Sequence, residues 1–516
     1  MSITSAIELK NITKKFGNVI ANSNVSLTVN CGEILALLGE NGSGKTTLMN
    51  MLSGIYFPDS GTISVDGREV TIRSPKDAFN LGIGMVHQHF KLVDVFTAAE
   101  NIVLGLTGKS KLNRKTIADE VTKISQKYGF VLDPNRKIYD MSVSEKQTAE
   151  IIKVLYRGAN ILILDEPTAV LTPQETNKLF EVLRNMKKDG KAIIIITHKL
   201  NEVMDISDKV AVLRKGEYID TVNTNETNPQ QLTDMMVGHA VSLNIDRPKS
   251  EKLSKRLEIK NVSCISDEGL SVLDKVSFTA FGGEILGVAG IAGSGQRELC
   301  EAIAGLQHLK EGSILYHSGE DGHENVDDLV GKNPMDIRQM GISLAFVPED
   351  RLGMGLVADM GMVDNMMLRS YRRGKSAFVD RRLPKKLAEE VRGKLKVVTP
   401  GINTPVRQLS GGNVQKVLLG REIASAPTVI MAAYPVRGLD INSSYTIYNL
   451  LNQQKSKGVA VIYIGEDLDV LLELCDRILV LCGGKVSGIV DGRTATKEQI
   501  GLMMTQIAEE GETVNE

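Results

Sequence analysis

The sequence contains no tryptophan and few aromatic residues of any kind, 4% of 516 residues. Its five cysteines are dispersed and form no C-x-x-C pair, which excludes a disulfide framework and the spacings typical of zinc sites. No apolar run approaches the roughly 18 residues that span a membrane. The formal net charge is −2, so general binding to nucleic acid is not indicated. The first residues lack the basic and apolar regions of a signal peptide, and we expect a cytosolic protein with reduced thiols.

One glycine-rich stretch carries the strongest chemical signal in the chain. It follows the apolar run 34–38, precedes periodic apolar residues at 48, 51 and 52, and matches the P-loop pattern G-x-x-x-x-G-K-[ST]. Its backbone N–H groups and the following helix N-terminus suit phosphate oxygens. Lys45 is expected to reach the β- and γ-phosphates of ATP, and the Thr46 hydroxyl to hold Mg²⁺. The predicted nucleotide-binding residues of this loop are Gly39, Glu40, Asn41, Gly42, Ser43, Gly44, Lys45, Thr46 and Thr47.

The same frame returns later in the chain, which indicates an internal repeat. Gly290 follows Gly39 by 251 positions, and Ser410 follows Ser142 by 268. The spacing grows only across polar segments around 317–333 and 350–361, which we interpret as loop insertions. The sequence therefore predicts two copies of one domain, 1–243 and 256–516, joined by a short polar linker at 244–255.

Each copy alternates continuous apolar runs with helical patterns. The runs at 160–164 and 192–196 are bounded by loops, as expected of strands buried on both faces of a parallel sheet. The predicted fold class is α/β, with two tandem P-loop domains.

In the first copy, further polar residues complete a set for ATP hydrolysis. Asp165 and Glu166 end an apolar strand, so Asp165 is assigned to Mg²⁺ and Glu166 to the catalytic base. Taken alone, this pair could equally cap a helix. His198 ends another strand and is expected to contact the γ-phosphate, although a lone histidine there is more often structural.

Two residues upstream add to this set. Gln88 would bring an amide to the metal and the nucleotide. Phe16 would stack on the adenine ring, with a place in the core as the alternative.

In the second copy the corresponding positions have lost this chemistry. Gln296 replaces Lys45, and Arg297 replaces Thr46. The counterparts of Asp165, Glu166, His198 and Gln88 are Ala433, Tyr434, Glu466 and Glu349. Loss of a base alone lowers a rate by roughly 10²–10⁴, so we expect negligible hydrolysis by this copy.

These motifs resemble the nucleotide-binding domain of ATP-binding cassette (ABC) proteins. The resemblance implies a Leu-Ser-Gly-Gly-Gln-type signature before the carboxylate strand. The second copy is close to that form at residues 409–413, whereas the first copy reads Met-Ser-Val-Ser-Glu at 141–145. The signature residues expected to contact ATP are Ser410, Gly411, Gly412 and Asn413.

In the ABC family each ATP is held between one P-loop and the signature of the opposite domain. The resemblance therefore implies one competent site, which joins the Lys45 loop to residues 410–413. The other site would join Gln296 to the altered signature at 142–145, so the defects fall together.

Two fused cassettes resemble the ATP-binding subunits of bacterial monosaccharide and nucleoside importers. Residues 82–90, 148–151, 155–159 and 165–172 look more like the nucleoside branch, while Ser144, Lys146 and Thr148 depart from it. The resemblance implies two different permeases, an indirect lipid-anchored binding protein, and a peripheral place on the cytoplasmic membrane face. Residues 89–101 would meet the permease coupling helices.

Several alternatives to nucleoside import stay open. Monosaccharide or riboflavin import would use the same ATPase, because no residue of this chain touches the solute. A twin-cassette ATPase acting on ribosomes usually keeps both sites and has a long basic linker, and a DNA-repair ATPase needs a coiled-coil or zinc insertion; neither feature is present.

Overall fold

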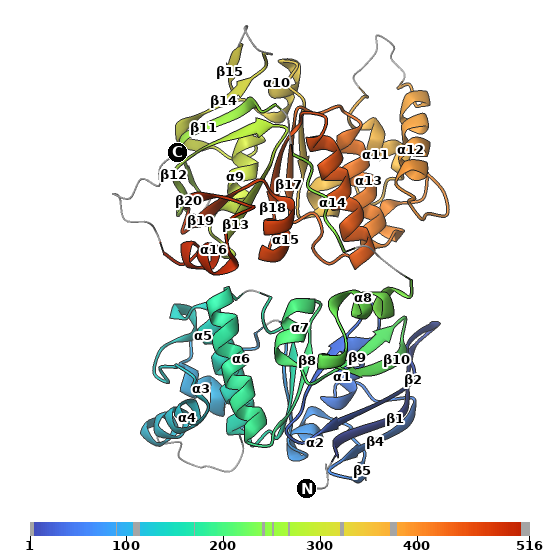
Figure 1. The fold of residues 1–516 in the computed structure, drawn as a ribbon, viewed down its shortest axis with the longest axis vertical. Coiled ribbons are helices and arrows are strands. Elements are labelled where there is room, and N and C mark those ends of the chain that lie inside the picture. The colour runs from blue at the N-terminus through green and yellow to red at the C-terminus, as the bar shows by residue number, and fades with distance from the viewer. Residues whose placement is uncertain are drawn as a thin grey trace. The chain divides into compact units, whose positions relative to one another are not determined.

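The computed structural model describes residues 5–88, 90–106, 114–169, 171–239, 243–249, 252–266, 269–319, 325–371 and 379–506. The chain folds into two compact units, Met1–Leu243 and Asn244–Glu516 (Figure 1). Each unit combines a mainly parallel set of strands with an antiparallel set, and the two units repeat the same order of elements. The predicted α/β class is confirmed.

In the first unit the described strands form one sheet in the order β5-β4-β1-β2-β10-β9-β3-β8-β7-β6. The strands are β1 (Ser5–Phe16), β2 (Val19–Asn30), β3 (Ile34–Leu38), β4 (Ser60–Val65), β5 (Arg68–Val70), β6 (Ile83–Val86), β7 (Ile161–Asp165), β8 (Ala192–Ile196), β9 (Lys209–Arg214) and β10 (Glu217–Asn223). The helices are α1 (Lys45–Leu52), α2 (Pro75–Asn80), α3 (Ala98–Val103), α4 (Arg114–Tyr128), α5 (Val143–Tyr156), α6 (Pro173–Lys188), α7 (Leu200–Ile206) and α8 (Pro229–Val237).

In the second unit the parallel and antiparallel strands form two sheets, β16-β17-β18-β13-β19-β20 and β12-β11-β14-β15. The strands are β11 (Ser254–Ile265), β12 (Ser271–Gly282), β13 (Ile285–Gly290), β14 (Leu309–His317), β15 (Val326–Asp328), β16 (Leu344–Val347), β17 (Val429–Ala433), β18 (Ala460–Ile464), β19 (Arg477–Cys482) and β20 (Lys485–Asp491). The helices are α9 (Gln296–Ile303), α10 (Pro334–Gln339), α11 (Met362–Met367), α12 (Arg382–Lys394), α13 (Gly411–Ile423), α14 (Ile441–Lys455), α15 (Leu468–Leu474) and α16 (Lys497–Met503).

The parallel strands are buried on both faces, as the apolar runs indicate. In β7, Ile161 and Ile163 join one apolar cluster, and Leu162 and Leu164 join another. Strands β6, β7, β8 and β3 run parallel, so their carboxyl ends share one edge of the sheet. That edge is where ligands bind in open α/β sheets.

The segment predicted to be a linker packs on the second unit over part of its length. Ile245 is 7% exposed and belongs to a core cluster of that unit. Asn452 Nδ2 donates to the Asp246 carbonyl at 2.7 Å, and Arg247 Nη1 donates to the Leu472 carbonyl at 3.0 Å. Residues 244–249 therefore extend the second unit.

One predicted insertion is partly regular. Residues 326–328 form β15, which pairs with the end of β14, while 320–324 lie outside the described residues. In the other insertion, residues 351–355 form one helical turn. Over the parts of the chain that the structure describes, no helix is long and apolar enough to cross a membrane.

Candidate active site

The P-loop of the first unit connects β3 to α1 and has the geometry of a phosphate cradle. Gly44 has φ +95°, and a Cβ there would lie 2.3 Å from the Ala21 carbonyl oxygen. Only glycine fits such a position. Lys45 Nζ donates to the carbonyls of Gly39 at 2.6 Å and Glu40 at 3.0 Å. The ammonium is thus held at the loop, within the space that its backbone encloses.

A buried asparagine on β2 supports the loop through a hydrogen bond. Asn22 is 0% exposed, and its Nδ2 donates to the Gly44 carbonyl at 3.2 Å. The same carbonyl accepts the first α1 hydrogen bond, from Leu48 N at 2.9 Å. Asn22 therefore holds the Gly44 peptide at the start of α1.

The carboxylates at the end of β7 lie close enough to Lys45 to interact with it. Burial, and secondly the charge of Glu166, raise the pKa of Asp165 to about 6, although Lys45 opposes the shift. Burial lowers the pKa of Lys45, while Glu166 and Asp165 oppose that change. The site thus has two carboxylates and one ammonium, a charge excess that favours binding of a further cation.

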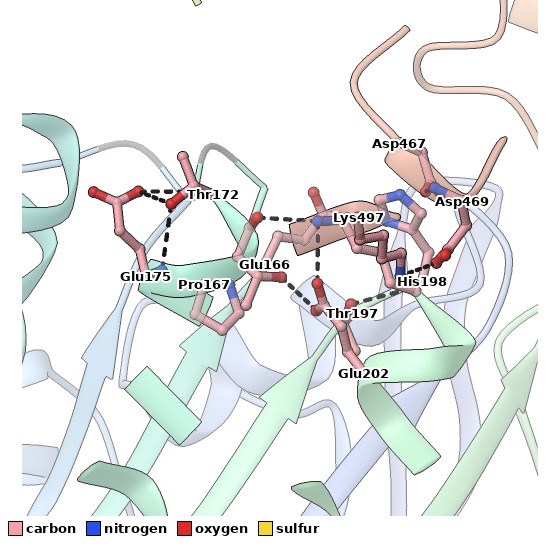
Figure 2. A network of polar contacts seen from close by, with 12 residues as sticks. Glu166, Pro167, Thr172, Glu175, Thr197, His198, Glu202, Asp467, Asp469 and Lys497 are labelled. Carbon is pink, nitrogen blue, oxygen red and sulfur yellow. Dashed lines mark hydrogen bonds and ion pairs between the residues drawn. The ribbon is translucent and has the colours of Figure 1, made fainter. Parts of the chain in front are cut away.

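Glu166 connects three segments of the site. Its Oε2 accepts from Gln88 Nε2 at 2.9 Å, and its Oε1 lies 3.0 Å from His198 Nδ1. The contact with His198 is the main cause that lowers the pKa of Glu166, so the carboxylate is ionised at neutral pH, as a base must be. Figure 2 shows Glu166, Thr197 and His198 beside the ends of the strands.

The backbone at Glu166 is unusual for a residue with a side chain. Its φ is +47°, in the left-handed region, and its N–H donates to the Ile196 carbonyl at 2.8 Å. Such a conformation costs on the order of 1–3 kcal/mol and persists when its surroundings hold it. Just after it, a capping box between Thr172 and Glu175 starts α6 and is drawn in Figure 2.

The donor set at this edge fits Mg²⁺. Thr46 is exposed at the start of α1, and Asp165 and Gln88 offer a carboxylate and an amide oxygen, the hard ligands that Mg²⁺ takes. Burial of Asp165, and secondly the charge of Glu166, raise its pKa, and a nearby divalent cation would stabilise its ionised form. Among the described residues no group of three or more His, Cys, Asp or Glu side chains could hold a metal, so phosphate and water oxygens would complete the coordination.

Phe16, the predicted adenine contact, stands at the end of β1 with 43% of its surface exposed. The ring of Tyr56 meets it edge-on, with centroids 5.1 Å apart. Lys14 Nζ lies 5.5 Å from the Phe16 centroid and 2.9 Å from Asp59 Oδ1. An exposed and braced ring suits a stacking platform and not a core position.

The two signature segments begin equivalent helices, but the N-termini of these helices differ in their capping. In the first unit Ser142 caps α5, and Glu145 completes a capping box with Ser142 N at 2.8 Å. In the second unit α13 starts at Gly411 after Ser410, and within the residues described there no side chain caps it and its first turn has no acidic residue. Gly412 is required there, because a Cβ would lie 2.5 Å from Ser443 Oγ. The α13 terminus is thus open to an anion, and the α5 terminus is already satisfied.

In the second unit the P-loop keeps its shape with different chemistry. Gly295 has φ +96°, and Gln296 Nε2 donates to the Ile291 carbonyl at 3.1 Å, the counterpart of the contact that Lys45 makes with Glu40. Arg297 pairs with Glu301 on its own helix at 2.7 Å. Tyr434 has φ +47°, as Glu166 has. The backbone is conserved between the units, and the charges are not.

The structure brings together Lys45, Asp165, Glu166, Gln88 and His198 in the first unit, and puts Phe16 at the end of β1. The signature residues belong to the second unit. Sequence reasoning missed Asn22 and Tyr56. For Asn22 one signal existed, since its counterpart at the repeat spacing is the apolar Leu273.

Comparisons with known proteins agree over nearly the whole chain. The sequence model of a family described as ABC transporter matches residues 22–169 and 273–435. The chain is 41% identical over 509 residues to the nucleoside import ATP-binding protein NupA of Lactococcus lactis, covering 98% of this chain and 99% of that protein. It is 42% identical over 503 residues to the guanosine import ATP-binding protein NupO of Bacillus subtilis, covering 96% and 97%. It is 38% identical over 538 residues to the glucose import ATP-binding protein TsgD13 of Haloferax volcanii, covering 97% and 95%.

Proposed function

Since the chain belongs to the ABC transporter family, we propose that it is the ATP-hydrolysing subunit of an importer and that nucleosides are its solute class. The observation that supports hydrolysis is the joint contact of Glu166 with Gln88 and His198, beside Lys45 and Asp165. The solute class is supported by the two nucleoside-import relatives at 41% and 42% identity. Sugar import is the second candidate, because the glucose-import relative is 38% identical.

In the proposed reaction Lys45 exchanges its carbonyl contacts for the β- and γ-phosphates. Glu166 leaves Gln88 and His198 and accepts a proton from the water whose oxygen attacks the γ-phosphorus. The bond from that phosphorus to the β–γ bridging oxygen breaks, and ADP leaves. His198 then donates to the γ-phosphate. Mg²⁺, when bound near Thr46, Gln88 and Asp165, neutralises phosphate charge.

We assign the one competent site to the first P-loop together with the second signature. The open α13 terminus supports this assignment, because its free N–H groups can bind a γ-phosphate. The capped α5 terminus carries Glu145, whose carboxylate would repel a phosphate. The impaired pair is then Gln296 with residues 142–145.

The partners we propose are permeases, two that differ from each other, with a lipid-anchored binding protein delivering the solute. The chain would lie on the cytoplasmic membrane face through them. Beside Gln88 the first unit has a hollow of about 380 Å³, near Val95, which is 62% exposed. The hollow is lined by Gln88, Phe90, Leu92, Asp94, Ile138, Val143 and Lys146. Phe90, Leu92 and Asp94 belong to the 89–101 segment proposed to meet a permease, of which His89 is outside the described residues.

Uptake of labelled guanosine tests the proposal in cells that carry this chain with its permeases. Uptake is expected in the wild type and lost in Glu166→Gln, whereas Tyr434→Phe, at the counterpart position, should retain it. Equal uptake with Glu166→Gln would overturn the one-site assignment. No uptake in any strain, with ATP turnover intact, would reject nucleosides, and glucose and ribose would be tested next.

A further inference from the structure

Arg437 in the second unit joins the positions that correspond to Gln88, Glu166 and His198. Its Nη1 pairs with Glu349, and its Nε lies 3.3 Å from Glu466 Oε1. The guanidinium carbon lies 5.9 Å from the centroid of the Tyr434 ring. One cation therefore contacts the ends of three segments, those that follow β16, β17 and β18.

The backbone holds this arginine in place. Its N–H donates to the Tyr434 carbonyl at 3.1 Å, and Arg351 Nη2 donates to the Arg437 carbonyl. The three side chains of the ion pairs are 39–53% exposed, and isolated pairs at such exposure contribute little. Here one guanidinium contacts two carboxylates and an aromatic ring, and such a network stabilises a structure more than an isolated ion pair does.

In the first unit the same three segments are joined by Glu166, which must release both contacts to act on water. In the second unit these segments are joined by Arg437, which has no part in the proposed hydrolysis. The counterpart of Arg437 at the repeat spacing is Ala169, so the cation is specific to the second unit.

We infer that Arg437 is a positioning residue, a permanently charged side chain that holds these three segments together whether or not nucleotide is bound. The segment after β16 continues through the helical turn Arg351–Gly355. Arg421 Nη2 holds the end of that turn through the Gly355 carbonyl at 2.7 Å. This region follows Glu349 as the 89–101 segment follows Gln88. The segment after β16 therefore keeps one conformation, while the corresponding segment of the first unit changes when nucleotide binds. Only the role of this region at a permease rests on the proposed function.

Hydrogen exchange on the full-length chain tests the inference without any partner. In the wild type, peptides covering 344–357 and 462–468 should exchange equally with and without Mg²⁺ and a non-hydrolysable ATP analogue. Peptides covering 85–96 should slow when the analogue binds. In Arg437→Met, the first two peptides should exchange roughly tenfold faster, and 1 M salt, which speeds exchange in the wild type, should have no further effect.

Two more variants separate this role from simple folding. Arg437→Lys keeps the charge and should restore at least half of the protection. Arg382→Met removes the exposed pair with Asp380 in the same unit and should leave both peptides unchanged. ATP turnover within twofold of wild type in Arg437→Met shows that the active site is intact. Exchange within twofold of wild type in Arg437→Met, or a wild-type response to the analogue as large as that of 85–96, would overturn the inference.

Discussion

The two units have nearly the same backbone at the carboxyl edge of the parallel sheet, but they carry different side chains there. Glu166 and Tyr434 both have φ +47°, and their N–H groups donate to the equivalent carbonyls of Ile196 and Ile464 at 2.8 and 2.9 Å. The same strained turn therefore holds a carboxylate in the first unit and a tyrosine in the second. The fold maintains the geometry of this edge, and a few side chains decide whether it hydrolyses ATP.

For the signature helices the difference is reversed: the unit with the complete loop has the altered signature. The first unit has the complete loop and a capped signature helix, whereas the second has the altered loop and an open helix. Each unit therefore has one of the two elements that we propose to form a working site, the complete loop or the open helix. Four predictions test the comparison of the two units.

The largest effect is expected from the base. Glu166→Gln should lower ATP turnover by roughly 10²–10⁴, because the amide cannot accept the proton. Phosphate release under saturating ATP measures it. The matched control is Tyr434→Phe, which should stay within twofold; a comparable loss in that variant would contradict the division of labour between the units.

Exchange of the loop residues should give the next largest effect. Lys45→Gln copies the second loop into the first and should weaken ATP binding roughly 10- to 100-fold, since a charge-assisted hydrogen bond is lost. Equilibrium titration with a fluorescent ATP analogue measures the affinity. The reverse change, Gln296→Lys, should restore no turnover in a Glu166→Gln background, because the second unit also lacks a metal ligand and a base. Recovered turnover would show that the second unit is closer to active than we infer.

The brace beneath the loop should have a smaller effect. Asn22→Leu, which copies the second unit, removes a hydrogen bond worth about 1 kcal/mol and should raise KM for ATP about three- to tenfold with little change in kcat. Steady-state kinetics separates the two parameters. Leu273→Asn should leave both unchanged while lowering stability. A fall in kcat alone for Asn22→Leu would argue against a role in loop orientation.

The smallest effect concerns stability and its dependence on pH. The folded pKa of Asp165 is about 6, above the ordinary value of 3.8, so its contribution to stability is present below the ordinary pKa and lost as pH rises through about 6. Asp165→Asn is uncharged throughout and should therefore raise the free energy of unfolding of the nucleotide-free chain by on the order of 1–2 kcal/mol at pH 7.5. Thermal unfolding should show the difference shrinking toward pH 4.5. A difference that persists there would assign the effect to packing instead.

The sequence predicted the two-cassette fold and the family, and both are confirmed. Strand runs and the P-loop are patterns of neighbouring residues, and the repeat is a regular spacing along the chain. All three can therefore be recognised in the sequence without the fold. The contacts of Glu166 with Gln88 and His198 required the fold, because the three residues are far apart in sequence. The contacts of Arg437 with Glu349 and Glu466 also required the fold, because these residues are far apart in sequence. The roles assigned to the site residues stay predictions.

The packing of residues 244–249 determines where the gene can be cut. A fragment that begins at residue 256 would lack Ile245 and leave a hole in a core, a defect that typically costs about 2–5 kcal/mol. It would also lack Arg247, whose guanidinium satisfies a carbonyl in the last turn of α15. A fragment that begins at Asn244 keeps both. Genetic separation of the two halves should therefore be made before Asn244, since the apparent tether belongs structurally to the half that follows it.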